Sequence, residues 1–285
     1  MNTMIYFLLS TIVFFNAVFF IMAVHEFYIS GKNKPSWVTC SQECEPQPPN
    51  GKPSVVLVHG FVGSPFDFKE LANELCRSGF RVVVPCMPGQ GSGDFAYTRG
   101  RLTVFSYISW LEEILKNEQK KTGMKPFLAG FSMGGTLSLI LSSRGLSGKL
   151  VLIAPFFDLP RPGFSSFVST LGWVFPVIPK TGRGKIYDPK AYSQYIPGSM
   201  LVSIPAFRKL KELAQMAEKA IADLPVPVFI ICSKNDQVAS YDRIRQLFKN
   251  RTGMDIREYN KGNHILLHDF QKADLIRDVR DFFLS

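Results

Sequence analysis

One serine in this sequence has the surroundings of a nucleophile. Ser132 lies between Gly130 and Gly134, after a short apolar run that suits a buried strand and before a second that suits a buried helix. This pattern predicts a sharp strand-to-helix turn, where a side chain at either glycine would collide with neighbouring backbone. The turn would expose the hydroxyl at the carboxyl edge of a sheet, beside the free N–H groups of the new helix. A lone motif of this kind is usually only a loop. Whether Ser132 is a nucleophile therefore depends on whether the chain also supplies a base, an acid and oxyanion donors.

A serine becomes a nucleophile only with a base within hydrogen-bond reach. The sequence has four histidines. His25 borders an apolar N-terminal run, and His59 lies in a His-Gly turn at the end of the first expected strand. His264 follows the last expected strand in a loop led by Gly262, where it can reach over the sheet edge, so it is the predicted base. His268 is predicted to be packed or at the surface.

The acid that orients the base should follow a late strand and precede the histidine. Asp236 does so, and we predict that its carboxylate holds the imidazole tautomer. Asp269 and Asp255 compete for this role, and Asp236 could instead only cap a helix. The order Ser132, Asp236, His264 is the nucleophile–acid–base order of one large class of hydrolases.

Two backbone N–H groups should stabilise the oxyanion of a tetrahedral intermediate. The N–H of Met133, directly after the serine, is the first candidate because it lies at the start of the expected helix. The N–H of Phe61, after His59 and Gly60, is the second. The sequence therefore predicts acyl transfer through a covalent serine intermediate.

The elements around these residues alternate between strands and helices. Such alternation predicts an α/β fold, with a mostly parallel sheet covered by helices on both faces. Sites in these sheets lie beyond the carboxyl ends of the strands, where all the candidate residues fall. The expected strands are Ser54–Val58, Phe80–Val84, Phe127–Ala129, Lys149–Ile153, Val228–Cys232 and Asp255–Tyr259, and the expected helices are Asp67–Arg77, Val104–Gln119, a run after Gly135, Tyr241–Phe248 and Lys272–Leu284.

Residues 156–222 interrupt the alternation. They are rich in aromatic residues, proline and glycine, with a helix expected from about Ile204 to Ala222 and no evident strand. The simplest interpretation is a long surface insertion. Because long insertions in compact domains are usually functional, we predict a helical lid over the active site.

The N-terminal residues 1–25 are almost wholly apolar and uncharged. About 20 such residues can cross a bilayer as a helix, so a single-pass transmembrane anchor is predicted, with the membrane side left open. A cleaved signal peptide is the alternative, but no Lys or Arg precedes the run. A polar linker is expected at 26–52 and one globular domain at 53–285.

Composition limits the partners. The net charge is +10, but Lys and Arg are scattered and no basic run with interleaved aromatics occurs, so nucleic acid is not expected. An anionic bilayer is the more plausible partner. The five cysteines form no Cys-x-x-Cys pair and no Cys/His cluster, so no metal site is expected. Cys40 and Cys44 could form a disulfide or remain thiols.

Together these residues resemble the α/β-hydrolase superfamily, within it the bacterial carboxylesterase and monoacylglycerol lipase branch. The similarity covers about Pro53 to Leu284 and rests on three segments, His-Gly-Phe-Val-Gly, Gly-Phe-Ser-Met-Gly-Gly and Gly-Asn-His, together with Asp236. It implies a serine esterase that cleaves short- or medium-chain acyl esters through an acyl-enzyme, without a cofactor. One departure is Gln90, where the family usually carries a histidine outside the triad.

Other functions remain open on the same scaffold. A prolyl-type aminopeptidase or an acyltransferase would use the same triad, and a pocket acid for an amine terminus would favour the peptidase. The sequence does not identify such an acid. A non-catalytic, membrane-tethered binding module would predict a damaged triad position, yet Ser132, Asp236 and His264 are all present. The predicted anchor favours a lipid-borne substrate, as for a lipase or lysophospholipase. The oligomeric state is open.

Overall fold

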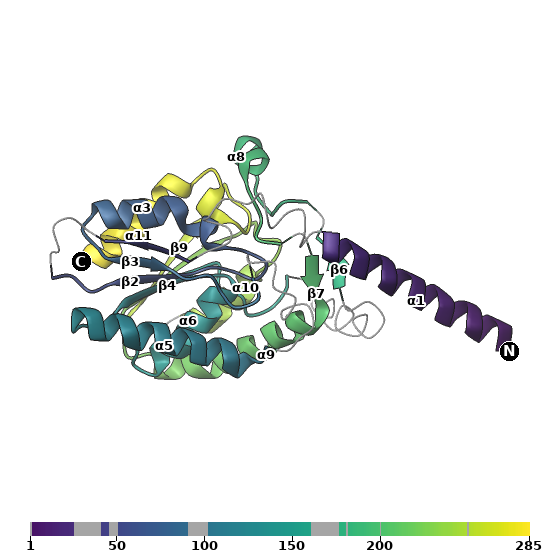
Figure 1. Cartoon of the computed structure of the whole chain (residues 1–285). Helices are drawn as coiled ribbons and strands as arrows, with labels where there is room; N and C mark the ends of the chain where they lie inside the picture. The colour runs from purple at the N-terminus through teal and green to yellow at the C-terminus, as the bar shows by residue number, and fades with distance from the viewer. Residues whose placement is uncertain are drawn as a thin grey trace.

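Runs of Val, Ile and Leu form the centre of a seven-stranded sheet (Figure 1). The computed structural model describes residues 2–25, 41–45, 51–90, 102–160, 177–180, 182–199, 201–249 and 251–285. The strand order is β1-β3-β2-β4-β5-β8-β9, and among these strands only β1 runs antiparallel to its neighbour. The predicted α/β class is confirmed. The strands are β1 Gln42–Cys44, β2 Val55–Val58, β3 Val82–Val84, β4 Phe127–Phe131, β5 Leu150–Ile153, β8 Val228–Ser233 and β9 Met254–Tyr259.

The register of the central strands aligns their carboxyl ends. Val58 of β2 pairs with Gly130 of β4, and the next residue of β4, Phe131, pairs with Ile153 of β5. Ile153 in turn pairs with Ile231 of β8. The loops after these strands therefore leave the sheet at one edge, which is where parallel sheets carry their sites.

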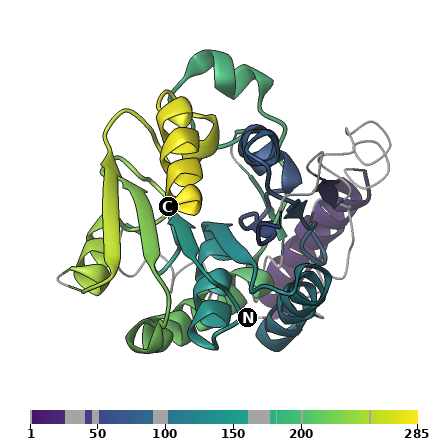
Figure 2. The ribbon, with the colours of Figure 1, turned by 90° about the vertical axis from the view of Figure 1, so that its left-hand side faces the viewer.

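Helices cover both faces of the sheet, as Figures 1 and 2 show. Successive strand residues point to opposite faces, so Val55 and Leu57 pack in one core and Val56 and Val58 in the other. The first core lies under α3 and α11, and the second lies under α5, α6, α9 and α10. These helices are α3 Lys69–Arg77, α5 Val104–Thr122, α6 Met133–Ser143, α9 Ile204–Ala220, α10 Tyr241–Phe248 and α11 Lys272–Leu284.

The region predicted as an insertion, 156–222, contains the expected helix, and its described residues also include two strands and a further short helix that were not expected. The predicted helix is confirmed as α9, Ile204–Ala220. The strands β6, Val177–Pro179, and β7, Leu201–Ser203, pair antiparallel, and three residues each are too few to show alternation in the sequence. Residues 161–176, 181 and 200 lie outside the described part. The remaining elements are α8 Pro189–Gln194 and the 3-10 turns η2 Pro65–Phe68, η3 Ile221–Asp223 and η4 Leu266–His268.

Strand β1 belongs to the sheet although it falls within the segment 26–52 expected to be linker. Its Cys44 lies opposite Val82 of β3 and forms a disulfide with Cys76 at the end of α3, with a Cα–Cα distance of 6.2 Å. The suggestion that Cys44 pairs with Cys40 or stays a thiol is therefore wrong, because strand pairing brings it to α3 instead. Cys40 itself, like residues 26–39 and 46–50, lies outside the described residues.

The N-terminal helix requires a second correction. Helix α1 spans Asn2–His25 and extends away from the sheet in Figure 1. A transmembrane helix needs about 20 consecutive, predominantly apolar residues. Across the residues that the structure describes, no helix satisfies both the length and the apolarity needed to cross a membrane. The predicted single-pass anchor at 1–25, and the membrane localisation drawn from it, are therefore wrong.

Candidate active site

Ser132 occupies the turn between β4 and α6. Its φ of 53° and ψ of −118° lie in a region that costs a non-glycine residue about 1–3 kcal/mol. Backbone hydrogen bonds hold it there. Its N–H donates to the Ile153 carbonyl at 2.9 Å, and its carbonyl accepts from Thr136 N at 3.1 Å and Phe156 N at 3.2 Å. The hydroxyl is thereby fixed beyond the end of β4, as the sequence predicts.

The flanking glycines are required by close backbone packing. A Cβ at Gly130 would collide with the carbonyl of Gly134. A Cβ at Gly134 would collide with the carbonyls of Val58 and His59. The tight turn and the close approach of α6 to the end of β2 therefore both depend on the absence of side chains.

The structure brings the three predicted triad side chains together. His264 Nε2 lies 3.0 Å from Ser132 Oγ, and His264 Nδ1 lies 2.8 Å from Asp236 Oδ2. The second carboxylate oxygen, Asp236 Oδ1, accepts the N–H groups of Val238 at 2.7 Å and Ala239 at 2.8 Å. Ser132, Asp236 and His264 are only 5%, 8% and 7% exposed. With Nδ1–H donating to the carboxylate, Nε2 is free to accept the serine proton.

The two competing acids lie elsewhere. Asp255 is exposed on β9. Asp269 is buried behind the histidine loop, where Oδ2 accepts the N–H groups of Asn263 at 2.8 Å and Tyr187 at 2.9 Å, and Oδ1 accepts that of Asp188 at 3.0 Å. Asp269 therefore connects the loop that carries the base to the chain before α8. Sequence reasoning missed this role.

The other two histidines of the globular region are structural. His59 donates Nδ1–H to the Gly60 carbonyl at 3.0 Å and accepts the Met87 N–H at Nε2 at 2.9 Å, which ties the end of β2 to the loop after β3. His268 is buried and stacks on Phe66 with ring centroids 5.3 Å apart. Burial lowers the pKa of both histidines. His268 is thus packed, as predicted.

The predicted oxyanion donors come from two segments next to Ser132, the start of α6 and the loop after β2. Met133 is the first residue of α6, so its N–H is one of the N–H groups that have no partner within the helix. Phe61 follows the His59-Gly60 turn and lines the same cavity as Ser132. A helix N-terminus also favours negative charge nearby. The arrangement suits an acyl-transfer site.

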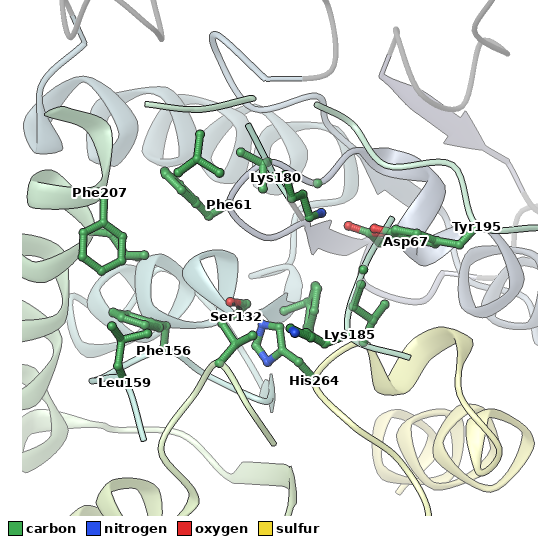
Figure 3. A pocket seen from close by; sticks show the side chains of 18 residues that line it. Phe61, Asp67, Ser132, Phe156, Leu159, Lys180, Lys185, Tyr195, Phe207 and His264 are labelled. Atoms are coloured by element: carbon green, nitrogen blue, oxygen red, sulfur yellow. Dashed lines mark hydrogen bonds between the residues drawn. The ribbon is translucent and has the colours of Figure 1, made fainter. Parts of the chain in front are cut away.

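A cavity of about 230 Å³ opens beside the triad (Figure 3). Its wall is mostly apolar and includes Phe156, Leu159 and Phe207. A buried acid, Asp67, also lines it, and the Tyr195 hydroxyl donates to Asp67 Oδ1 at 2.7 Å. Within the described residues, no group of three His, Cys, Asp or Glu side chains could hold a metal ion.

Asp67 is the site residue that sequence reasoning missed. The sequence predicts it only as the first residue of an amphipathic helix. Its partner Tyr195 lies 128 residues away, in the interrupted region. No local signal distinguishes it, because an acidic residue in the first turn of a helix is common.

Comparison with known proteins agrees with this geometry. The model of the family described as "Serine aminopeptidase, S33" matches residues 49–271. A thermostable monoacylglycerol lipase from Bacillus sp. (strain H-257) is 34% identical over 242 residues, which cover 82% of this chain and 91% of that protein.

Solved structures give the same fold. A metagenome-derived lipolytic enzyme matches with a TM-score of 0.74 at 20% identity, over 86% of this chain and 97% of the other. The monoacylglycerol lipase of Paleococcus ferrophilus matches with a TM-score of 0.72 at 20% identity, over 86% and 98% of the two chains. The fold, the family match and the relative agree, and the chain belongs to the serine aminopeptidase family of α/β-hydrolases.

Proposed function

We propose that this protein hydrolyses carboxylic esters of lipids, of the monoacylglycerol type, with Ser132 as nucleophile, His264 as base and Asp236 as orienting acid. The observation that carries the proposal is the pair of contacts at His264, 3.0 Å to Ser132 Oγ and 2.8 Å to Asp236 Oδ2. The name of the 34% identical relative supports the substrate class.

The reaction proceeds in two acyl transfers. As Ser132 Oγ attacks the ester carbon, His264 Nε2 takes its proton, and Asp236 stabilises the imidazolium. The N–H groups of Phe61 and Met133 stabilise the oxyanion. When the intermediate collapses, the carbon–alkoxy bond breaks and His264 returns the proton to the leaving alcohol. Water then attacks the acyl-enzyme with His264 again as base, which releases the acid and restores Ser132.

The size and lining of the cavity indicate which acyl chains the site accepts. Its volume of about 230 Å³ is below the usual range of roughly 300–1,000 Å³ for ligand pockets. Apolar side chains make up most of its wall, which suits a hydrocarbon. We therefore favour short- and medium-chain acyl groups.

We further infer that the domain extends over about 53–285 and that its segment 156–222 acts as a lid. Residues of the segment support this role because they line the cavity beside the triad, Tyr195, Phe207 and Leu210 among them. The lid thus contributes to the acyl-binding surface.

The test is hydrolysis of 4-nitrophenyl esters from acetate to palmitate by the full-length protein. We expect turnover with an optimum at short or medium chains. Ser132→Ala should lower kcat by at least about 10⁴-fold, because a triad serine cannot be replaced by its neighbours. Ser143→Ala, on the same helix but away from the site, is the matched control. Equal activity of Ser132→Ala and wild type would contradict the mechanism.

A serine aminopeptidase is the second candidate, and one observation favours it. Asp67 is a buried acid in the cavity wall, the feature that binding of an amine terminus requires. Cleavage of aminoacyl 4-nitroanilides distinguishes the two functions. An esterase should leave these amides intact while it turns over the esters. Faster cleavage of the amides than of any ester would favour the aminopeptidase.

A further inference from the structure

We propose that Asp67 and Tyr195 form the leaving-group side of the cavity and select esters of alcohols that carry free hydroxyl groups. The inference rests on the proposed ester hydrolysis. It assigns the buried acid to recognition of a polyol such as glycerol.

The cavity has two unlike sides. In Figure 3, Phe156, Leu159 and Phe207 lie on one side of Ser132, and Asp67 and Tyr195 lie on the other. The first side presents only hydrocarbon and the second presents a carboxyl group and a phenol. A substrate that matches both sides is amphipathic, with its reacting carbon at Ser132.

The geometry of acyl transfer assigns a substrate part to each side. Once Ser132 Oγ has added to the ester carbon, the acyl chain and the alkoxy oxygen leave that carbon in different directions. The apolar side accepts the acyl chain, because burial of hydrocarbon against hydrocarbon is favourable. The alcohol therefore extends toward Asp67 and Tyr195.

Asp67 retains hydrogen-bonding capacity. An ionised carboxylate can accept about four hydrogen bonds. Oδ1 accepts the Tyr195 hydroxyl at 2.7 Å, whereas Oδ2 has, among the residues that the structure describes, only a long contact of 3.4 Å with Ser64 N. Asp67 is 1% exposed, so bulk water does little to satisfy it. A substrate hydroxyl would supply the missing donor, and burying an alkyl group there would leave the carboxylate poorly solvated.

Tyr195 stays a phenol in this environment. Burial and the neighbouring Asp67 raise its pKa well above the ordinary value. Its hydroxyl therefore donates to Asp67 and leaves its own oxygen as an acceptor for a second substrate hydroxyl. A vicinal diol could use both groups.

The charges around the cavity favour a neutral alcohol over an ammonium group. Lys180 and Lys185 line the same cavity as Asp67. The ammonium group of Lys185 disfavours a second cation in this cavity, whereas a neutral hydroxyl group is not repelled.

The experiment compares three decanoate esters that differ only in the alcohol: glyceryl, propyl and 3-aminopropyl. In the wild-type protein, kcat/KM for the glyceryl ester should exceed that for the propyl ester by about 10- to 100-fold, the usual value of a hydrogen bond to a charged group. The 3-aminopropyl ester should be no better than the propyl ester.

Variants of Asp67 then test whether this residue causes the preference for the glyceryl ester. Asp67→Leu should bring the glyceryl-to-propyl ratio close to 1 while the propyl ester is still turned over. Asp67→Asn retains a side-chain oxygen that can accept the Ser64 N–H group. It therefore replaces the Leu variant in the experiment if that variant does not fold. We expect its glyceryl-to-propyl ratio of kcat/KM to fall several-fold. Asp278→Asn is the control, because Asp278 accepts the Tyr259 hydroxyl at 2.8 Å and does not line the cavity. Its ratio should match the wild type.

Four results would overturn the inference. These are a wild-type ratio near 1, an unchanged ratio in Asp67→Asn, an equal loss on both esters in the Asp67 variants, and a preference for the 3-aminopropyl ester. Wild-type protein that turns over none of the esters would instead contradict the proposed function itself, and the inference with it.

Discussion

Ser132 is one of three non-glycine residues with positive φ in the described chain, together with Val62 and Ala154. The three follow β2, β4 and β5 at the same edge of the sheet. Each such conformation costs about 1–3 kcal/mol and persists only where the surroundings determine it. The local strain is therefore concentrated around the proposed nucleophile, where it fixes the position of the hydroxyl and of the oxyanion loop.

Asp236→Asn tests the acid at the residue scale. The Asn side chain can keep its oxygen toward Val238 N and Ala239 N, which turns its NH₂ toward His264 Nδ1. The imidazole must then carry its proton on Nε2 and cannot accept that of Ser132. We expect kcat to fall by about 10³- to 10⁴-fold with little change in KM. A kcat within tenfold of wild type, in protein of unchanged Tm, would show that Asp236 is not the acid.

Local patterns were enough to find the triad but not its supports. Ser132, Asp236 and His264 each follow a predicted strand, so chain order and the sheet edge together identify them. Asp67 and Asp269 act through partners that lie 128 and 82 residues away. No periodicity or spacing in the sequence can reveal a contact of that kind.

At the scale of elements, the segment 182–199 connects the two loops that flank the serine. Ser199 N donates to the Val62 carbonyl at 3.2 Å, in the oxyanion loop. Ile265 N donates to the Lys185 carbonyl at 3.1 Å, in the histidine loop. Displacement of this segment should therefore disturb both the cavity wall and the catalytic geometry.

Asp269→Asn tests this connection. One oxygen becomes an NH₂ group, so two of the backbone N–H groups that Asp269 now accepts lose their partner. We expect kcat for a 4-nitrophenyl ester to fall by about tenfold and KM to rise, because the histidine loop and the cavity wall both loosen. Asp278→Asn is the matched control, since it removes a bond to the Tyr259 hydroxyl away from the site. Equal kinetic effects of the two variants would reduce the role of Asp269 to general stability.

The disulfide holds the edge strand β1. Cys44→Ser should lower the free energy of unfolding by about 3–4 kcal/mol, the loop-closure value for a separation of 32 residues. Urea denaturation measures the change, with Cys86→Ser as the control outside the disulfide. Equal stability of the Cys44→Ser variant and the wild type would mean that the disulfide does not stabilise the fold. A strand of three residues with a partner cysteine 32 residues away could not be predicted from the sequence.

For the whole molecule, the buried histidines set a pH dependence of stability. Burial lowers the pKa of His59 and His268 in the folded chain below the unfolded value of 6.5. Below about pH 6.5 the unfolded chain therefore binds protons that the folded chain does not, so stability is present above this pH and is lost as the pH falls. We expect the free energy of unfolding to drop by up to about 2 kcal/mol between pH 7.5 and 5.5.

Replacement of one histidine tests whether the buried histidines cause this pH dependence of the free energy of unfolding. His268→Phe keeps a ring stacked on Phe66 and should remove up to about half of the loss, measured by urea denaturation at the two pH values. An unchanged pH dependence would assign it to other groups.

The sequence predicts the three-layered α/β architecture because most strands of the main sheet, and the helices that cover its two faces, are long enough to show their own pattern. The membrane anchor predicted from the apolar composition of residues 1–25 is wrong.

The most direct test of the account is the intact mass of the full-length protein after reaction with a fluorophosphonate. We expect the wild type and Ser143→Ala to gain the mass of one phosphonate and Ser132→Ala to gain none, because only a serine paired with a base reacts rapidly. Labelling of Ser132→Ala, or folded wild-type protein that remains unlabelled, would contradict the claim that Ser132 is an activated nucleophile.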